Sequence, residues 1–152
     1  MKVAANPSNG TPAIAVHAQT MRAIGQPEPI SEAAARLLGV LGIAAIAVVH
    51  ILDAADTYQS TRYIFWLYMA IIVGAIPIAG VLLHVASPRA WLGAAALASG
   101  PLVGYVLSRS IGLPADSGDI GNWLDTLGMV SLFVEVSVLS LSLARLALHR
   151  RA

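Results

Sequence analysis

The sequence predicts an all-α membrane protein, a four-helix transmembrane bundle with a flexible N-terminal tail. Of its 152 residues, 57% are hydrophobic and only 11% are charged, whereas soluble domains carry about 25% charged residues. Four apolar runs approach or reach the roughly 20 residues that a helix needs to cross a bilayer. None of these runs alternates between apolar and polar residues, as the strands of a membrane barrel would.

Composition also excludes several functions. Nine Lys and Arg residues against eight Asp and Glu residues give a net charge of +1, so the chain lacks the basic surface that a nucleic-acid partner requires. The absence of cysteine excludes disulfides, thiol catalysis and Cys-ligated metals. No nucleotide-binding loop, nucleophile elbow or HExxH motif is present, which favours a protein that is not an enzyme. The sequence indicates no particular cofactor.

The N-terminal segment differs from the rest of the chain. Residues 1–34 contain four prolines and no long apolar run, which predicts a disordered or peripheral cytoplasmic tail. Near its end, Ser31 followed by Glu32 resembles a helix N-cap with an acidic residue in the first turn. The first helix should therefore begin at the water interface.

Four predicted spans follow, at residues 35–53, 64–84, 91–108 and 126–148, which together make the transmembrane domain 35–148. Gly100 and Gly104 form a GxxxG pair in the third span, where we expect tight packing within the bundle. Pro77 and Pro101 each remove a backbone donor, which predicts kinks near mid-membrane.

Lys and Arg residues predict the orientation. Seven of them lie on the side that holds both termini and the middle loop, whereas only Arg62 and Arg109 lie on the other. By the positive-inside rule, both termini, including residues 149–152, are cytoplasmic in a multi-pass protein of the cell membrane. Boundary aromatics are expected at Trp91 on the inner side, and on the outer side at Tyr58, Tyr63, Trp66 and Trp123.

Glu135 lies nine positions into the fourth span, roughly 13 Å deep. A charge at the bilayer centre costs on the order of 2.5–3.5 kcal/mol, so this side chain should face the bundle interior. Gly128, Ser131 and Ser142 share its helical stripe. Glu135 is either a proton, cation or ligand site, or a structural acid that hydroxyl groups bind.

His50 and Asp53 form a second candidate group near the outer end of the first span. Their spacing of three residues places both on one helical face, where they could hold one ion or proton together. Alternatively, His50 extends toward the interface while Asp53 and Asp56 mark the end of the helix.

Arg109 ends the third span and begins the longest outer loop, whose glycines and proline predict turns rather than a strand. Its guanidinium could fold back to Glu135. It could instead meet Asp116, Asp119 or Asp125 in the loop, which would leave Glu135 available to His50.

The outer motifs together resemble a family. His50, the Ser-Arg-x-x-Gly-Leu-Pro turn at residues 108–114, Trp123 and Glu135 follow one another as in a group of small, uncharacterised four-span membrane proteins from actinobacteria. The resemblance covers residues 37–148 and implies the same four-span fold. Tyr105, beside the turn motif, completes the candidate site. The family tends to place an acid and a proline directly after the tryptophan, whereas here Leu124, Asp125 and Thr126 follow.

Three functions fit these residues. We expect first a small membrane protein with a polar site in the outer half of the bundle that binds a proton, a cation or a small ligand. The alternative is an accessory or scaffolding subunit that docks a membrane-protein partner or a second copy. A metalloenzyme is the third hypothesis, in which the metal ligands would be His50, Asp53, Asp56 and Glu135. Only one of these is an imidazole, which is few for a catalytic iron or copper site.

Overall fold

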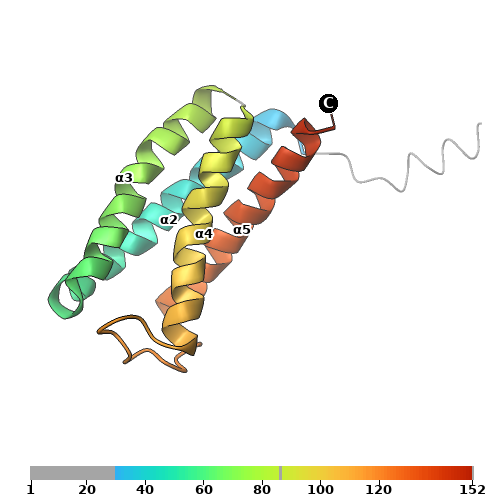
Figure 1. Cartoon of the computed structure of the whole chain (residues 1–152). Coiled ribbons are helices and arrows are strands. Elements are labelled where there is room, and N and C mark those ends of the chain that lie inside the picture. The colour runs from blue at the N-terminus through green and yellow to red at the C-terminus, as the bar shows by residue number, and fades with distance from the viewer. Residues whose placement is uncertain (1–29, 86, 152) are drawn as a thin grey trace, which may run out of the picture. The chain divides into compact units, whose positions relative to one another are not determined.

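The computed structural model describes residues 30–85 and 87–151, and within them the chain is a helical bundle. Its four helices belong to one compact unit that begins at Ser31 (Figure 1). They are α2 (Glu32–Ser60), α3 (Arg62–His84), α4 (Pro88–Ser110) and α5 (Thr126–His149). The predicted flexible tail falls mainly on residues 1–29, which lie outside the described residues.

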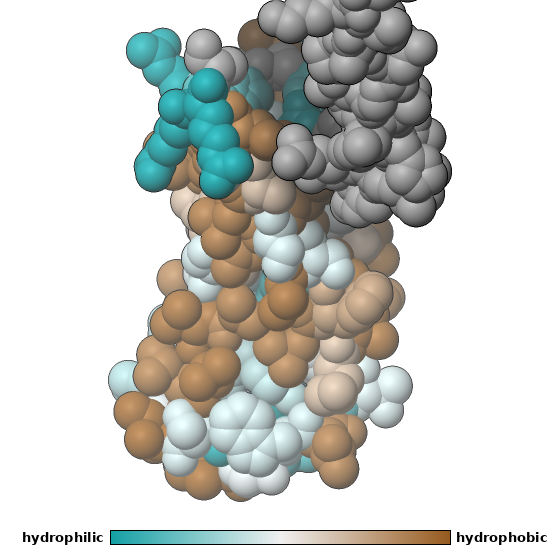
Figure 2. All heavy atoms as spheres, turned by 90° about the vertical axis from the view of Figure 1, so that its right-hand side faces the viewer, coloured by the Kyte–Doolittle hydropathy of each residue, from teal (hydrophilic) through white to brown (hydrophobic). Residues whose placement is uncertain are grey.

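Each of the four helices is long and apolar enough to cross a membrane. Figure 2 shows apolar residues over the middle of one face of the bundle and strongly hydrophilic residues at the end where α5 finishes. The predicted four-helix architecture is therefore confirmed.

The helices run alternately up and down, so that consecutive helices are neighbours (Figure 1). α2 contacts α3 and α5, α4 contacts α3 and α5, and α3 and α5 lie diagonally across the bundle. The start of α2, the end of α3, the start of α4 and the end of α5 share one end, here called the termini end. Thr61 and the loop 111–125 share the other, here called the loop end.

Helix α2 is longer at both ends than the predicted span. The Ser31 side chain accepts a hydrogen bond from the Ala34 amide, which confirms the N-cap but makes residues 32–34 helical rather than part of the tail. At the other end, α2 continues past Asp53 and Asp56 to Ser60, so these acids do not mark the helix end. The segment 53–60 contains neither glycine nor proline, so no helix-breaking residue ends α2 before Ser60.

The core of the termini end forms around Trp91, which is fully buried. A Cβ atom built on Gly39 would lie 2.7 Å from Leu82 Cδ2 and 3.1 Å from Trp91 Cζ3. The indole therefore fills a space that glycine leaves on α2. Trp91 lies in the first turn of α4, at the end of the helix where a boundary aromatic was predicted, but its side chain points into the bundle.

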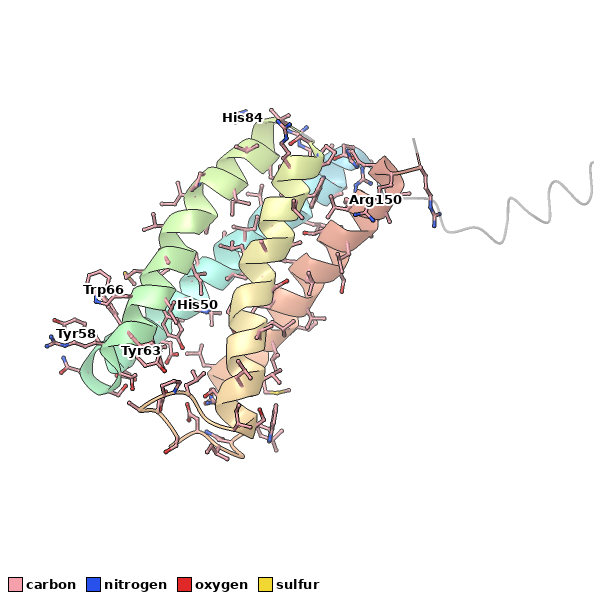
Figure 3. All side chains as sticks on the ribbon, in the orientation of Figure 1. His50, Tyr58, Tyr63, Trp66, His84 and Arg150 are labelled. Carbon is pink, nitrogen blue, oxygen red and sulfur yellow. The ribbon has the colours of Figure 1, made fainter. Side chains whose placement is uncertain are left out.

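Polar contacts fasten the termini end. The Arg36 guanidinium donates to the carbonyl groups of Leu82 (2.9 Å) and Leu83 at the last turn of α3, where helix carbonyls lack partners of their own. Arg145 on α5 forms an ion pair with Glu32 on α2. Figure 3 places His84 and Arg150 at this end, and Tyr58, Tyr63 and Trp66 at the loop end.

Candidate functional site

A cavity of about 780 Å³ occupies the bundle toward the loop end. All four helices and the loop 111–125 contribute to its wall. The five predicted site residues all line it: His50, Asp53, Tyr105, Arg109 and Glu135. Figure 3 shows the His50 side chain pointing from α2 into the space between the helices. The structure therefore brings together residues that lie up to 85 positions apart in the sequence.

Arg109 joins the end of α4 to the loop and to α5. Its guanidinium forms an ion pair with Asp119, and its Nη2 lies 4.0 Å from Asp125 Oδ2. The guanidinium carbon lies 4.9 Å from the centre of the Tyr105 ring, a cation–π contact. Of the two predicted arrangements, the structure shows the one in which Arg109 binds loop acids and not Glu135.

Asp125, the second of these acids, also stands at the start of helix α5. Asp125 Oδ2 accepts a hydrogen bond from the Gly128 amide at 2.8 Å and so caps α5. Asp125 therefore acts as an N-cap as well as a second acidic neighbour of Arg109.

The loop 111–125 is a series of turns fastened to the helices, as its glycines predicted. Gly112 and Gly121 have positive φ angles of 79° and 81°, which glycine adopts without steric cost. The Gly121 amide donates to the Arg109 carbonyl at 2.9 Å. The hydroxyl of Tyr63 on α3 donates to the Pro114 carbonyl, and that of Tyr105 on α4 to the Trp123 carbonyl, each at 2.9 Å. The loop thus covers the loop end of the cavity.

His50 and Asp53 meet through a third side chain, Tyr68 of α3. The tyrosine hydroxyl donates to Asp53 Oδ2 at 2.8 Å, and its ring packs edge-on against the imidazole with centroids 4.8 Å apart. His50 Nδ1 donates to the Ile46 carbonyl at 2.8 Å, which leaves Nε2 as the acceptor of the neutral ring. His50 is 5% exposed, so the alternative in which it extends to the interface was wrong.

Sequence reasoning missed Tyr68. The available signal was its hydroxyl, a polar group within the apolar run of residues 64–84. Such a group needs a hydrogen-bond partner from another helix when it is buried in lipid. The partner could not be named, because the sequence does not show which helix lies opposite.

Glu135 is the most deeply buried of the acids that line the cavity, with 1% of its surface exposed. Its Oε1 accepts a hydrogen bond of 2.5 Å from the Ser131 hydroxyl one turn earlier. Its Oε2 is buried and has no hydrogen-bond partner among the described residues. A carboxylate oxygen in this state is costly unless a donor reaches it.

The GxxxG pair of α4 lines the cavity and does not pack against another helix. A Cβ atom at Gly100 or Gly104 would meet no atom of the described chain within 4 Å beyond its own helix, and both residues line the cavity. The expectation of tight packing was therefore wrong. Because glycine has no side chain, these two positions leave the cavity open on the α4 side. Pro101 lies in the same wall.

Carboxylates dominate the ionisable groups of the wall. Six of the described residues contribute one each: Asp53, Asp56, Asp116, Asp119, Asp125 and Glu135. The basic side chains of the wall are Arg109, which is already paired with Asp119, and His50. Within residues 30–85 and 87–151, however, no three His, Cys, Asp or Glu side chains are placed to hold one metal ion. The four proposed metal ligands thus share the cavity without forming a coordination group.

Comparison with protein-family models, curated proteins and solved structures finds no match to this chain. The resemblance to the actinobacterial four-span proteins stays a prediction, and the chemistry of the cavity carries the functional argument.

Proposed function

We propose that the chain is an integral membrane protein that binds a small organic cation in this cavity, with Glu135 as the anionic partner. The observation that carries the proposal is the buried Oε2 of Glu135, which lacks a donor on the wall of a cavity rich in carboxylates. An ammonium group would supply that donor and balance the charge. Polar intramembrane acids of this kind mark binding sites or relays in many membrane proteins.

The size of the cavity favours an organic ligand over a bare ion. Small-molecule sites are typically about 300–1,000 Å³ and mostly apolar, with a few polar groups that orient the ligand. A cavity of about 780 Å³ falls in that range, and Val49, Ile71 and Leu97 supply apolar surface. A single metal ion or proton would fill very little of it.

The proposed topology places the termini end in the cytoplasm. That end holds Arg36, Arg89, Arg145, Arg150 and Arg151, whereas the loop end holds Arg62 and Arg109, in agreement with the positive-inside rule. The cavity then lies in the outer half of the cell membrane. Reporter fusions after His149 and within the loop 111–125 test this orientation, and an extracellular C-terminus would contradict it.

The ligand proposal is tested with benzylamine and its uncharged isostere benzyl alcohol, added to the protein in lipid nanodiscs. We expect benzylamine to raise the unfolding temperature and benzyl alcohol to leave it unchanged. Glu135→Gln should weaken benzylamine binding tenfold or more, because a charge-assisted hydrogen bond contributes about 1.5–3 kcal/mol. Ser142→Ala is the matched control, since Ser142 is a buried polar residue of α5 outside the cavity.

The same variants separate a binding role from a purely structural one. If Glu135 only holds the helices in register, Glu135→Gln lowers the unfolding temperature of the unliganded protein and leaves the benzylamine response intact. That result, or an equal response to benzylamine and benzyl alcohol, would overturn the proposal.

A role as an accessory subunit is the second candidate. Small residues of α4 could dock a partner helix, yet Ala90, Ala94, Ala95 and Ala98 are buried inside the bundle, and Gly100 and Gly104 line the cavity. The four buried alanines therefore do not form an outward docking face.

A further inference from the structure

The cavity wall is incomplete between α3 and α4. Toward the termini end the two helices touch, since a Cβ atom built on Gly74 would lie 3.6 Å from Leu97 Cδ1 and one built on Gly93 would lie 3.5 Å from Ile78 Cγ1. Beyond these contacts the ribbons diverge toward the loop end (Figure 1). Gly100 is exposed there and meets nothing on α3.

The opening, here called the window, has side walls made of apolar and small residues. On α3 these are Leu67, which is 56% exposed, and Ala70; on α4 they are Gly100 and Gly104. All four also line the cavity. The hydrogen bond from Tyr63 to the Pro114 carbonyl closes the window at the loop end.

The window lies at the depth of lipid acyl chains. Leu67 and Ala70 are five and eight residues from the start of α3 at Arg62, or about 8–12 Å at 1.5 Å per residue. The hydrocarbon of one leaflet is about 15 Å thick. The loop covers the axial end of the cavity, so the uncovered side faces the interior of the outer leaflet on the proposed topology.

We infer that the ligand is an amphiphilic amine that enters sideways from the outer leaflet through the window between α3 and α4. This inference rests on the proposed function and specifies its ligand. The amine reaches Glu135 on α5, which lies diagonally across the bundle from α3, and the apolar tail leaves through the window into the lipid. A primary or secondary amine fits better than a quaternary one, because Glu135 Oε2 lacks a hydrogen-bond donor.

The test compares dodecylamine with benzylamine and dodecanol in nanodiscs, with amounts expressed per lipid. We expect dodecylamine to stabilise the wild-type protein, dodecanol to have no effect, and Glu135→Gln to remove the dodecylamine response. Gly100→Leu and Gly104→Leu, which place a side chain in the window, should weaken the dodecylamine response tenfold or more. The benzylamine response should fall less than the dodecylamine response, because benzylamine has no tail to place in the window, and circular dichroism shows whether the variants fold.

Gly80→Leu is the matched control, because Gly80 is another helix glycine with no described atom within 4 Å of an added Cβ and lies outside the cavity. It should change neither response. If benzylamine binds and dodecylamine does not, the inference of an amphiphilic ligand is overturned and the proposed cation site remains. Binding of neither amine would overturn the proposed function itself.

A second measurement decides the case if the window variants lose both responses. The chain has no cysteine, so Ala70→Cys and Ile76→Cys each allow one nitroxide label; Ile76 is 71% exposed away from the cavity. Dodecylamine should slow the label at residue 70 and leave that at residue 76 unchanged. An unchanged spectrum at residue 70 would overturn the sideways route.

Discussion

Replacement of Gly42 by alanine tests how α2 packs against α5. A Cβ atom built on Gly42 lies 2.3 Å from Val138 Cγ2, whereas carbon atoms in contact are normally about 3.5–4.0 Å apart. Val138 is β-branched and restricted to few rotamers in a helix, so the two helices must separate by about 1 Å. Overpacking of this kind costs about 1–3 kcal/mol, against about 1 kcal/mol gained when alanine replaces glycine in a helix.

Gly80→Ala supplies the reference value, since an added Cβ there meets no described atom within 4 Å. It should stabilise the protein by about 1 kcal/mol, and Gly42→Ala should be about 1–3 kcal/mol less stable than Gly80→Ala. Reversible unfolding in mixed micelles of increasing sodium dodecyl sulfate content, followed by circular dichroism, measures both free energies.

A third variant identifies the cause. Val138→Ala removes the colliding methyl group and leaves Val138 Cβ 3.8 Å from the new atom, which is ordinary contact. In that background Gly42→Ala should stabilise the protein as much as Gly80→Ala does. Equal free energies for Gly42→Ala and Gly80→Ala in the otherwise unchanged chain would show that α2 and α5 do not meet at this point.

Three further substitutions probe the site by the same unfolding assay. Asp125→Ala removes the acceptor of the Gly128 amide and should lower the free energy of unfolding by about 0.5–2 kcal/mol. Asp125→Asn keeps an acceptor and should retain most of the stability, so equal stability of the two variants would contradict the cap. Tyr68→Phe removes the hydrogen bond to Asp53 and should cost about 1–2 kcal/mol, and no loss would show that the bond is not made. Ala115→Gly, at a φ of 59°, should stabilise by about 0.5–1 kcal/mol, whereas destabilisation would mean that the turn is not strained.

The helices were predictable because each of them contains one long apolar run of the length that a membrane span needs. The N-cap at Ser31 was also readable, because capping depends on residues within one turn. The end of α2 was not, since aspartates can either stop a helix or line its polar face. Asp53 does the latter, and its partner Tyr68 comes from the next helix.

His50 and Glu135 were predictable as residues that face the bundle interior, and their partners were not. Polar side chains in apolar runs must face a protein interior, which placed Glu135 and His50 together in advance. The partners depend on which helices are neighbours and on how each helix is rotated about its axis, and a single sequence does not show either. Gly104 is an example. A glycine can allow two helices to pack closely or can leave a cavity open, and which of these occurs depends on the position of the neighbouring helix.

The unequal connections of the bundle have a mechanical consequence. α2 and α3 are joined by Thr61 alone, and Arg109 ties α4, its loop and α5 to one another. The molecule is therefore two stiff hairpins placed side by side, and the cavity is the space between them. Two seams border that space, α2 with α5 and α3 with α4. Because α3 and α4 touch toward the termini end and diverge toward the loop end (Figure 1), we expect the cavity to widen most readily at the loop end of that seam.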